Sequence, residues 1–220
     1  MSQQHQDEAS PEPRFQRRKD QRPKEIAQAA LEVFAERGFA GARVSDVAER
    51  AGVSKGLMYL YYKTKQDLLK AVIRGFIEPR VRDIAAAIEG WNGSAAAFLR
   101  GPFLETISQL AASRAVIIIR LMMAEGPNHP DLTKYYYDHV ITVGLGALSG
   151  LLDRAVEQGE FQTSGIHRYP QLLLAPVVMA AVWQTVFDRH QRLDVKAFLA
   201  AHVETAISAM ARPQGDGVTP

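Results

Sequence analysis

The sequence of 220 residues contains no cysteine. Disulfide bridges, thiolate nucleophiles and cysteine-ligated zinc are therefore excluded. Neither a His-Glu-x-x-His nor a Gly-x-Ser-x-Gly motif occurs, and the histidines from His129 to His202 do not have metal-ligand spacing. We therefore predict that the protein is not an enzyme, binds no metal and needs no cofactor.

Long hydrophobic runs are also missing. The first twenty residues are polar and charged, without the apolar stretch of a signal peptide. The most apolar segment, Leu172 to Trp183, is shorter than the roughly 20 residues of a membrane span and contains Pro176. We expect a soluble, cytoplasmic protein that has no membrane partner.

Net charge is low, at +2, but the two parts of the chain differ. Residues 1–80 contain 15 Lys and Arg against 11 Asp and Glu, whereas residues 81–220 contain 11 against 13. The basic excess of the N-terminal part is what a nucleic-acid partner attracts, although it could equally be a solvated surface. The hydrophobic content of 47% is sufficient for a buried core.

Both ends of the chain are predicted to be disordered tails, over residues 1–20 and 213–220. The first has almost no large apolar residues, and its distal part is basic. Arg14, Arg17, Arg18 and Lys19 could lie in a DNA minor groove, or the tail could simply keep the protein in solution.

Between the tails, the first predicted helix begins near Pro23 and runs to Arg37, where Gly38 ends it. The second helix ends at Gly52, and its apolar residues have the i, i+3, i+4, i+7 spacing of one helix face: Val44, Val47, Ala48 and Ala51. These two helices and a third that begins near Ser54 predict a helix-turn-helix.

The third helix has two distinct faces. Val53, Met58 and Tyr62 can point to the core, which leaves four residues facing outward: Lys55, Leu57, Tyr59 and Tyr61. Cations that meet phosphates and apolar groups that meet thymine methyls suit a major groove. The pair Thr64 and Asp67 resembles a capping box, which would begin a fourth helix.

From residue 80 onward the pattern is helical throughout, and the whole chain is predicted to be all-α with about nine helices. Residues 115–123 are β-branched enough to form a buried strand, but their helical surroundings favour a buried helix. The glycines of residues 144–150 lack a nucleotide-binding fingerprint, so they are interpreted as sites of close helix packing. The last two helices are expected at residues 170–189 and 194–211.

The chain resembles the tetracycline-repressor (TetR) family of bacterial transcription regulators. The resemblance rests on the ungapped segment from Val44 to Leu69, with its Ala-Gly-Val-Ser turn at residues 51–54 and its Gly-Leu-Met-Tyr-Leu-Tyr-Tyr core at residues 56–62. It implies a DNA-binding domain over residues 21–67 and a helical effector-binding and dimerisation domain over residues 68–212.

The resemblance implies contacts with double-stranded DNA, and the residues expected to make them are Arg43, Ser45, Ser54, Lys55, Gly56, Leu57, Tyr59, Tyr61, Lys63 and Lys65. Lys65 is expected to hold a phosphate together with the N-terminus of the fourth helix. Arg43 stands where the family commonly has a capping threonine, so Arg43 or Ser45 would supply that phosphate contact.

A cavity for a small-molecule effector is expected between the later helices. Its expected lining residues are Phe103, Arg120, Met122, Met123, Tyr136 and Trp183. Arg120 lies inside an apolar run, where it could pair with Glu105 or Glu125, or could anchor an anionic effector.

The last two helices carry more apolar surface than one protomer needs, which predicts a homodimer built on a four-helix bundle. The expected interface residues are Leu173, Val177, Ala181, Phe198, Leu199, Val203 and Ile207. The implied function is that of a repressor that binds a pseudo-palindromic operator and is released by an effector. An activator, a ligand-independent regulator, or a helical ligand-binding protein or enzyme without an operator remain alternatives.

Overall fold

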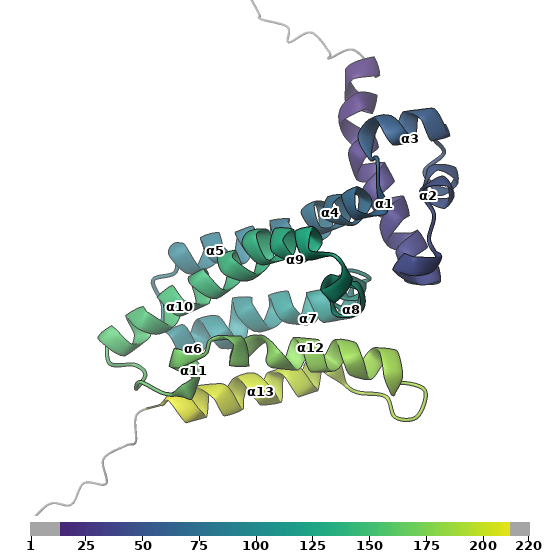
Figure 1. The fold of residues 1–220 in the computed structure, drawn as a ribbon. Coiled ribbons are helices and arrows are strands. Elements are labelled where there is room, and N and C mark those ends of the chain that lie inside the picture. Colours follow the sequence, from purple (N-terminus) through teal and green to yellow (C-terminus); the bar gives the residue numbers. More distant parts are fainter. Residues whose placement is uncertain (1–13, 212–220) are drawn as a thin grey trace, which may run out of the picture.

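The structure is a computed structural model that describes the backbone of residues 14–211 and the side chains of residues 21–211. Within this range the chain is helical, and its one β contact is an isolated antiparallel bridge between Phe161 and Ala211. The all-α prediction is therefore confirmed. Figure 1 shows a small group of N-terminal helices at one end of an elongated helical body, with α4 leading from one to the other.

The N-terminal group consists of α1 (Arg14–Gly41), α2 (Val44–Arg50) and α3 (Lys55–Tyr61), and α4 spans Lys65–Phe76. Helix α1 begins before the predicted start near Pro23. Pro23 lies inside the helix, where its missing N–H leaves out one backbone hydrogen bond but does not end the helix. Residues 14–20 are thus helical and do not belong to a disordered tail. The other residues of the two predicted tails, 1–13 and 213–220, lie outside the described residues.

The predicted helix ends and caps are confirmed in this part of the chain. Gly38 and Gly52 adopt φ angles of 67° and 64°, which end regular helical backbone and which side chains with a Cβ rarely adopt. The Thr64 hydroxyl accepts a hydrogen bond from the Asp67 N–H at 3.1 Å, and the Asp67 carboxylate accepts one from the Thr64 N–H at 3.0 Å. This capping box fixes the point at which α4 begins.

The body begins with α5 (Glu78–Glu89). It continues through the following helices: α6 (Ala95–Phe98), η1 (Leu99–Phe103), α7 (Leu104–Ala112), α8 (Val116–Glu125), η2 (Gly126–Asn128), α9 (Pro130–Tyr136), η3 (Tyr137–Ile141), α10 (Thr142–Glu157), α11 (Gly165–Arg168), α12 (Gln171–Val186) and α13 (Val195–Met210). The segment that could have been a strand is helix α8, and the two predicted terminal helices are α12 and α13. Short helices such as α6 and α11 raise the number above the expected nine.

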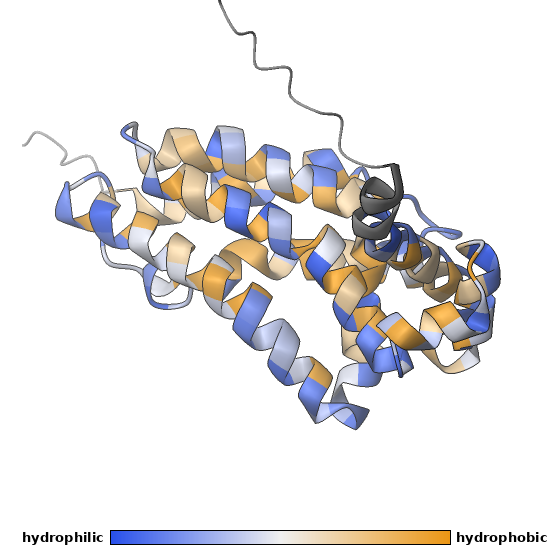
Figure 2. Ribbon diagram, turned by 90° about the horizontal axis from the view of Figure 1, so that it is seen from above, coloured by the Kyte–Doolittle hydropathy of each residue, from blue (hydrophilic) through white to orange (hydrophobic). Residues whose placement is uncertain are grey.

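Two hydrophobic cores stabilise the chain. One joins α1 to α4 and extends to α8 and α9 through Ile118, Leu121 and Leu132. The other fills the far end of the body, where α6, α7, α10, α12 and α13 meet. Figure 2 shows hydrophobic and hydrophilic positions alternating along the helices, as expected for helices that bury one side. The first core makes α8 and α9 the parts of the body that contact the N-terminal group.

Helices α9, η3 and α10 form one continuous helix, Pro130–Glu157, which is long and apolar enough to cross a membrane by those two criteria alone. Its apolar side packs against α5 and lines a cavity, described below. A Cβ placed on Gly144 would lie 3.6 Å from Cγ1 of Val81, so this glycine permits close packing of α10 on α5. The predicted close helix packing is therefore seen at Gly144, whereas a Cβ on Gly146 would meet no atom within 4 Å.

Candidate nucleic-acid interface and effector cavity

Helix α3 exposes one face to solvent. Gly56, Tyr59 and Leu60 have the i, i+3, i+4 spacing of one face and are all exposed, with Leu60 at 77% and Tyr59 at 52%, and Lys63, just beyond the end of α3, is exposed as well. Met58, on the opposite face, is fully buried in the core of the N-terminal group. An exposed leucine and tyrosine between cations form an apolar and basic strip, which is suited to base edges flanked by phosphates.

Most of the predicted DNA-contacting residues are accessible. Those that are exposed are Arg43, Ser54, Lys55, Gly56, Tyr59 and Lys63, and those that are half-buried are Ser45, Leu57, Tyr61 and Lys65. Tyr61 packs against the core and is therefore less available than predicted. Leu60 was absent from the predicted DNA contacts, although its spacing of four residues from Gly56 places it on the same face of α3.

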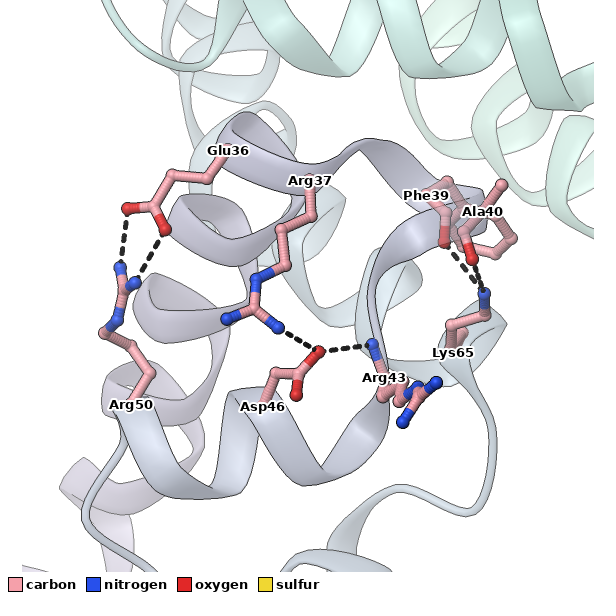
Figure 3. A network of polar contacts seen from close by, with 8 residues as sticks. All are labelled: Glu36, Arg37, Phe39, Ala40, Arg43, Asp46, Arg50 and Lys65. Atoms are coloured by element: carbon pink, nitrogen blue, oxygen red, sulfur yellow. Dashed lines mark hydrogen bonds and ion pairs between the residues drawn. The ribbon is translucent and has the colours of Figure 1, made fainter.

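Two of these side chains are already engaged within the domain. The Ser54 hydroxyl accepts a hydrogen bond from the Leu57 N–H at 3.2 Å and so caps α3. The Lys65 ammonium donates to the carbonyl oxygens of Phe39 and Ala40 at 2.8 and 3.2 Å (Figure 3), and it lies 4.8 Å from the centre of the Phe39 ring. The structure therefore places the charge of Lys65 on the unpaired carbonyls at the end of α1, and a phosphate would have to compete with them.

Ion pairs set the position of α2 against α1. Arg50 pairs with Glu36 at 2.7 Å and with Glu32 at 3.3 Å, and Arg37 pairs with Asp46 at 2.7 Å (Figure 3). Asp46 also accepts a hydrogen bond from the backbone N–H of Arg43 at 3.0 Å. The hydrogen bond from Arg50 lowers the pKa of the Glu36 carboxyl. These contacts orient α2, and among the side chains of residues 21–211 the exposed face of α3 has no ion-pair partner.

A second polar cluster joins α4 to the body through Tyr135 of α9. Its hydroxyl donates to Glu78 at 2.6 Å and accepts from Nε of Arg74 at 3.3 Å. Lys70 and Arg74 also lie 5.8 and 5.9 Å from the centre of its ring. Glu78 is only 4% exposed, so this bond satisfies a buried carboxylate. We call Tyr135, Glu78 and Arg74 the α4–α9 clamp.

The body contains a cavity of about 870 Å³, which lies within the usual size range of small-molecule sites. It is enclosed by α5, α7, α8, α12 and the continuous helix Pro130–Glu157. Most of its lining is apolar, including Ile84, Ile107, Ile119, Leu148, Leu174 and Val177. Such a volume among aliphatic side chains favours an apolar ligand over ordered water.

Four of the six predicted pocket residues line this cavity: Phe103, Met122, Met123 and Tyr136. Burial raises the pKa of the Tyr136 hydroxyl to about 12, so this group stays protonated at physiological pH and can serve as a hydrogen-bond donor. Met123 and Tyr137 are both lining residues and exposed, so the cavity is open on that side.

The other two predicted residues, Arg120 and Trp183, do not line this cavity. Trp183 lies outside the cavity, and its indole N–H donates to the carbonyl of Gln191 at 2.8 Å. Arg120 lines a separate groove of about 460 Å³ with Glu36 of α1 and Arg114. Among the described side chains it forms no ion pair with Glu105 or Glu125. Val116 and Ile117 line the same groove as Arg120, whereas Ile119 and Met122 line the cavity, so the apolar run in the sequence did not show which side of α8 carries Arg120.

The predicted dimer-interface residues are mostly buried inside the protomer. Those that lie in its own core are Leu173, Val177, Ala181, Leu199, Val203 and Ile207, and Phe198 is half-buried against the same core. The stripe of α12 that faces solvent is instead Leu172, Met179 and Val186, which are 43%, 49% and 49% exposed. Their seven-residue spacing is that of a helix-pairing seam.

The exposed helix α3 on a helix-turn-helix, joined to a body that encloses an apolar cavity, defines a DNA-binding protein with a separate ligand-binding domain. Residues 26–72 match the family described as bacterial regulatory proteins, tetR family, and residues 102–213 match the C-terminal domain of AefR-like transcriptional repressors. The chain belongs to the tetR family, and it is a ligand-responsive, DNA-binding transcriptional regulator.

Related proteins match most of the chain. The fatty acid metabolism regulator protein of Bacillus subtilis is 27% identical over 198 residues, which is 87% of this chain and 98% of that protein. The structure of the B. subtilis regulator FadR in complex with stearoyl-CoA has a TM-score of 0.72 at 24% identity and covers 85% and 98% of the two chains. The SmeT–triclosan complex has a TM-score of 0.73 at 20% identity and covers 90% and 94%. These two structures support the fold.

Proposed function

We propose that the protein is a repressor that binds a pseudo-palindromic operator as a homodimer and is released by a long, apolar small molecule. The observation that carries this proposal is the double role of the continuous helix Pro130–Glu157. One side of this helix lines the apolar cavity, and Tyr135 on the same helix holds α4, which leads from the DNA-binding domain.

The DNA surface of each protomer is the exposed face of α3. Tyr59 and Leu60 contact base edges, and Lys55, Lys63 and Arg43 supply charge to the phosphates on either side. A single helix reads too few base pairs for a specific site, so two copies bind half-sites about 34 Å apart on the duplex. This requirement makes the dimer part of the function.

The dimer forms through the outer stripe of α12, which consists of Leu172, Met179 and Val186. An apolar stripe along a whole helix is costly to leave in water. Small exposed residues on the neighbouring α13, such as Ala197 and Ala201, permit close approach of a second pair of helices. The complete regulator is a cytoplasmic homodimer with a four-helix bundle at its centre.

The effector is a molecule that carries a long alkyl chain. The cavity residues on the continuous helix run from Pro130 to Leu148, a distance of about 27 Å at 1.5 Å per residue. This length fits an extended chain better than a compact ring system. A fatty acid metabolism regulator among the relatives and a related structure that contains stearoyl-CoA support the same class of ligand.

Release follows from a shift between two positions of α4. A ligand that fills the cavity contacts Tyr136 and Thr133, the neighbours of Tyr135 on α9, and so changes the α4–α9 clamp. The hydrogen bond between Gln66 of α4 and His129, at 3.4 Å, is a second contact across the same boundary. The ligand must favour the DNA-incompetent position by about 5.5 kcal/mol for a nearly complete switch.

The test is a gel-shift titration with the DNA that flanks the gene, at several salt concentrations. Wild-type protein should bind one pseudo-palindromic site with an affinity that falls steeply with salt, and oleoyl-CoA should release it. Tyr59→Ala should weaken binding by about tenfold or more, because a desolvated base contact is lost. Tyr137→Ala, an equally exposed tyrosine of the body, should leave binding of ligand-free protein unchanged. Equal affinity for unrelated DNA, or an unchanged affinity of Tyr59→Ala, would contradict the proposal.

A further inference from the structure

The apolar cavity contains three charged residues in its lining, Arg80, Lys134 and Asp138. Lys134 and Asp138 pair with each other at 2.7 Å and so neutralise one another. Arg80 has no carboxylate within ion-pair distance in the described part of the chain. The lining therefore carries one uncompensated positive charge.

Arg80 lies on the apolar face of α5, between Ile77, Val81 and Ile84, which line the same cavity. Its side chain is half-buried, and one guanidinium N–H donates to the carbonyl oxygen of Phe76. A guanidinium has five N–H donors in a planar fork, so this bond leaves most of them available. A partly desolvated cation beside an apolar cavity is stabilised when an anion binds to it.

We propose that Arg80 binds an anionic head group of the effector, and that the effector is therefore a long-chain amphipath with a carboxylate or phosphate at one end. The alkyl chain lies along Pro130–Glu157, and the head group pairs with the guanidinium at the start of α5. This inference rests on the proposed effector cavity and adds the charge of the ligand and the residue that selects it.

The position of Arg80 also links the head group to DNA release. Phe76 is the last residue of α4, and its carbonyl is one of the helix-end oxygens that lack a partner within the helix. An anion that draws the guanidinium to itself weakens this contact at the end of the helix that carries the DNA-binding domain. An uncharged ligand of the same length would fill the cavity without acting on this bond.

The proposal is tested by calorimetric titration of the full-length protein with dodecanoate, dodecyl phosphate and dodecanol. Wild-type protein should bind at least one of the two anions roughly tenfold or more tightly than the alcohol, which is the worth of a hydrogen-bonded charge. A preference for dodecanoate identifies a carboxylate head, and a preference for dodecyl phosphate identifies a phosphate head. In Arg80→Gln this preference should disappear through weaker binding of the anion, while the affinity for dodecanol stays the same.

The matched control is Arg82→Gln on the same helix, because Arg82 lies outside the cavity lining and pairs with Glu78. It should retain the wild-type preference. Arg80→Lys, which keeps the charge but loses the fork, should retain part of it. If Arg80→Gln does not fold, Arg80→Lys and the loss of the dodecanoate preference at a pH that protonates dodecanoic acid give the same answer.

Equal binding of anion and alcohol by wild-type protein, or an equal loss of both in Arg80→Gln, would overturn the role of Arg80. If the alcohol and the anions bind with equal affinity and both release the operator, the proposed function stands without the charge selection. If none of the three binds or releases DNA, the cavity is not the effector site, and the proposed function fails with it.

Discussion

The DNA-binding domain and the body differ in how completely their apolar side chains are packed. In the DNA-binding domain Met58 and Phe34 fill a closed core, and Ser54, Thr64 and Lys65 satisfy helix ends with their own side chains. The body encloses a cavity of about 870 Å³ and leaves apolar residues of α12 in solvent. The first region therefore has a filled core, whereas the second has an unfilled cavity and an exposed apolar stripe, which the proposed ligand and second protomer would cover.

This contrast has an energetic basis. A cavity forfeits packing contacts of the side chains around it, at roughly 24 cal/mol per Å³ where a core residue has been removed. Exposed apolar stripes likewise lose burial. A ligand that fills the cavity, or a partner that covers the stripe, would therefore increase the free energy of unfolding of the body. The core of the DNA-binding domain is already filled, so its stability depends less on a ligand, which suits a domain that presents one fixed surface.

The largest effect is expected from a charge placed in the body core. Leu199 is fully buried, so Leu199→Glu should lower the free energy of unfolding by about 3 kcal/mol or more, measured by chemical denaturation. Met179→Glu places the same charge on the outer stripe of α12 and should leave the protomer folded but monomeric in sedimentation. A folded Leu199→Glu monomer, or a dimeric Met179→Glu protein, would show that the inner stripe forms the interface after all.

The next largest effect is expected when a larger side chain fills the cavity. Ile119→Phe adds a ring to the lining of α8, so the affinity for long-chain ligands should fall by about tenfold, since overpacking in the bound state costs 1–3 kcal/mol. Operator binding without ligand should stay at the wild-type level, so the variant should act as a repressor that ligand does not release. Calorimetry and gel shift measure the two quantities. Normal release by ligand would place the effector elsewhere.

A smaller effect is expected at the boundary between the two regions. Tyr135→Phe removes the hydroxyl that joins Glu78 and Arg74 but keeps the ring. The factor by which ligand weakens operator binding should fall about two- to tenfold, the worth of one such hydrogen bond. Tyr169→Phe removes a hydroxyl from an exposed tyrosine of the body that lies outside the cavity lining, and is the control. An unchanged factor in Tyr135→Phe would mean that the α4–α9 clamp does not transmit the ligand signal.

The smallest effect is expected within the DNA-binding domain. Arg50→Ala removes ion pairs with Glu36 and Glu32, which are largely exposed and contribute little. The hydrogen bond from Arg50 lowers the pKa of Glu36 below its usual 4.5, so the stabilisation is complete above that pH and is lost as pH falls through the lowered value. Wild-type and variant unfolding curves should differ slightly at neutral pH and converge in acid. A difference that grows in acid would contradict this assignment.

The DNA-binding domain was largely predictable because its signals are local. Gly52, Ser54, Thr64 and Asp67 act within four residues of their partners, so the turn and the start of α4 follow from spacing alone. Lys65 was assigned to a phosphate from its place at the start of the fourth helix, and its observed partners, Phe39 and Ala40, are too far away in the sequence to be inferred from spacing. Leu60 was omitted although its spacing from Gly56 was visible, so that residue could have been identified.

The body was predictable only in outline. Helix α12 is apolar nearly all round, so its sequence could not show that Leu173 and Val177 face inward and Leu172 and Met179 outward. The charged residue of the cavity was also predicted incorrectly, as Arg120 instead of Arg80, because the sequence of a helix does not show which side faces the cavity. Arg120 stands out inside an apolar run, while Arg80 follows Ile77 and precedes Val81 and Ile84 at helical spacing, and that interruption of an apolar face is the signal in the sequence.

The sequence by itself determined an all-helical chain, the helix-turn-helix with its caps, and the family. These follow from periodicity and from hydrogen bonds between near neighbours, which depend on residue order alone. Only the tertiary structure decided where the apolar cavity lies, that Arg80 rather than Arg120 borders it, and which stripe of α12 faces out. A cavity and a solvent-facing stripe are defined by what several distant helices leave uncovered, and no single segment contains that information.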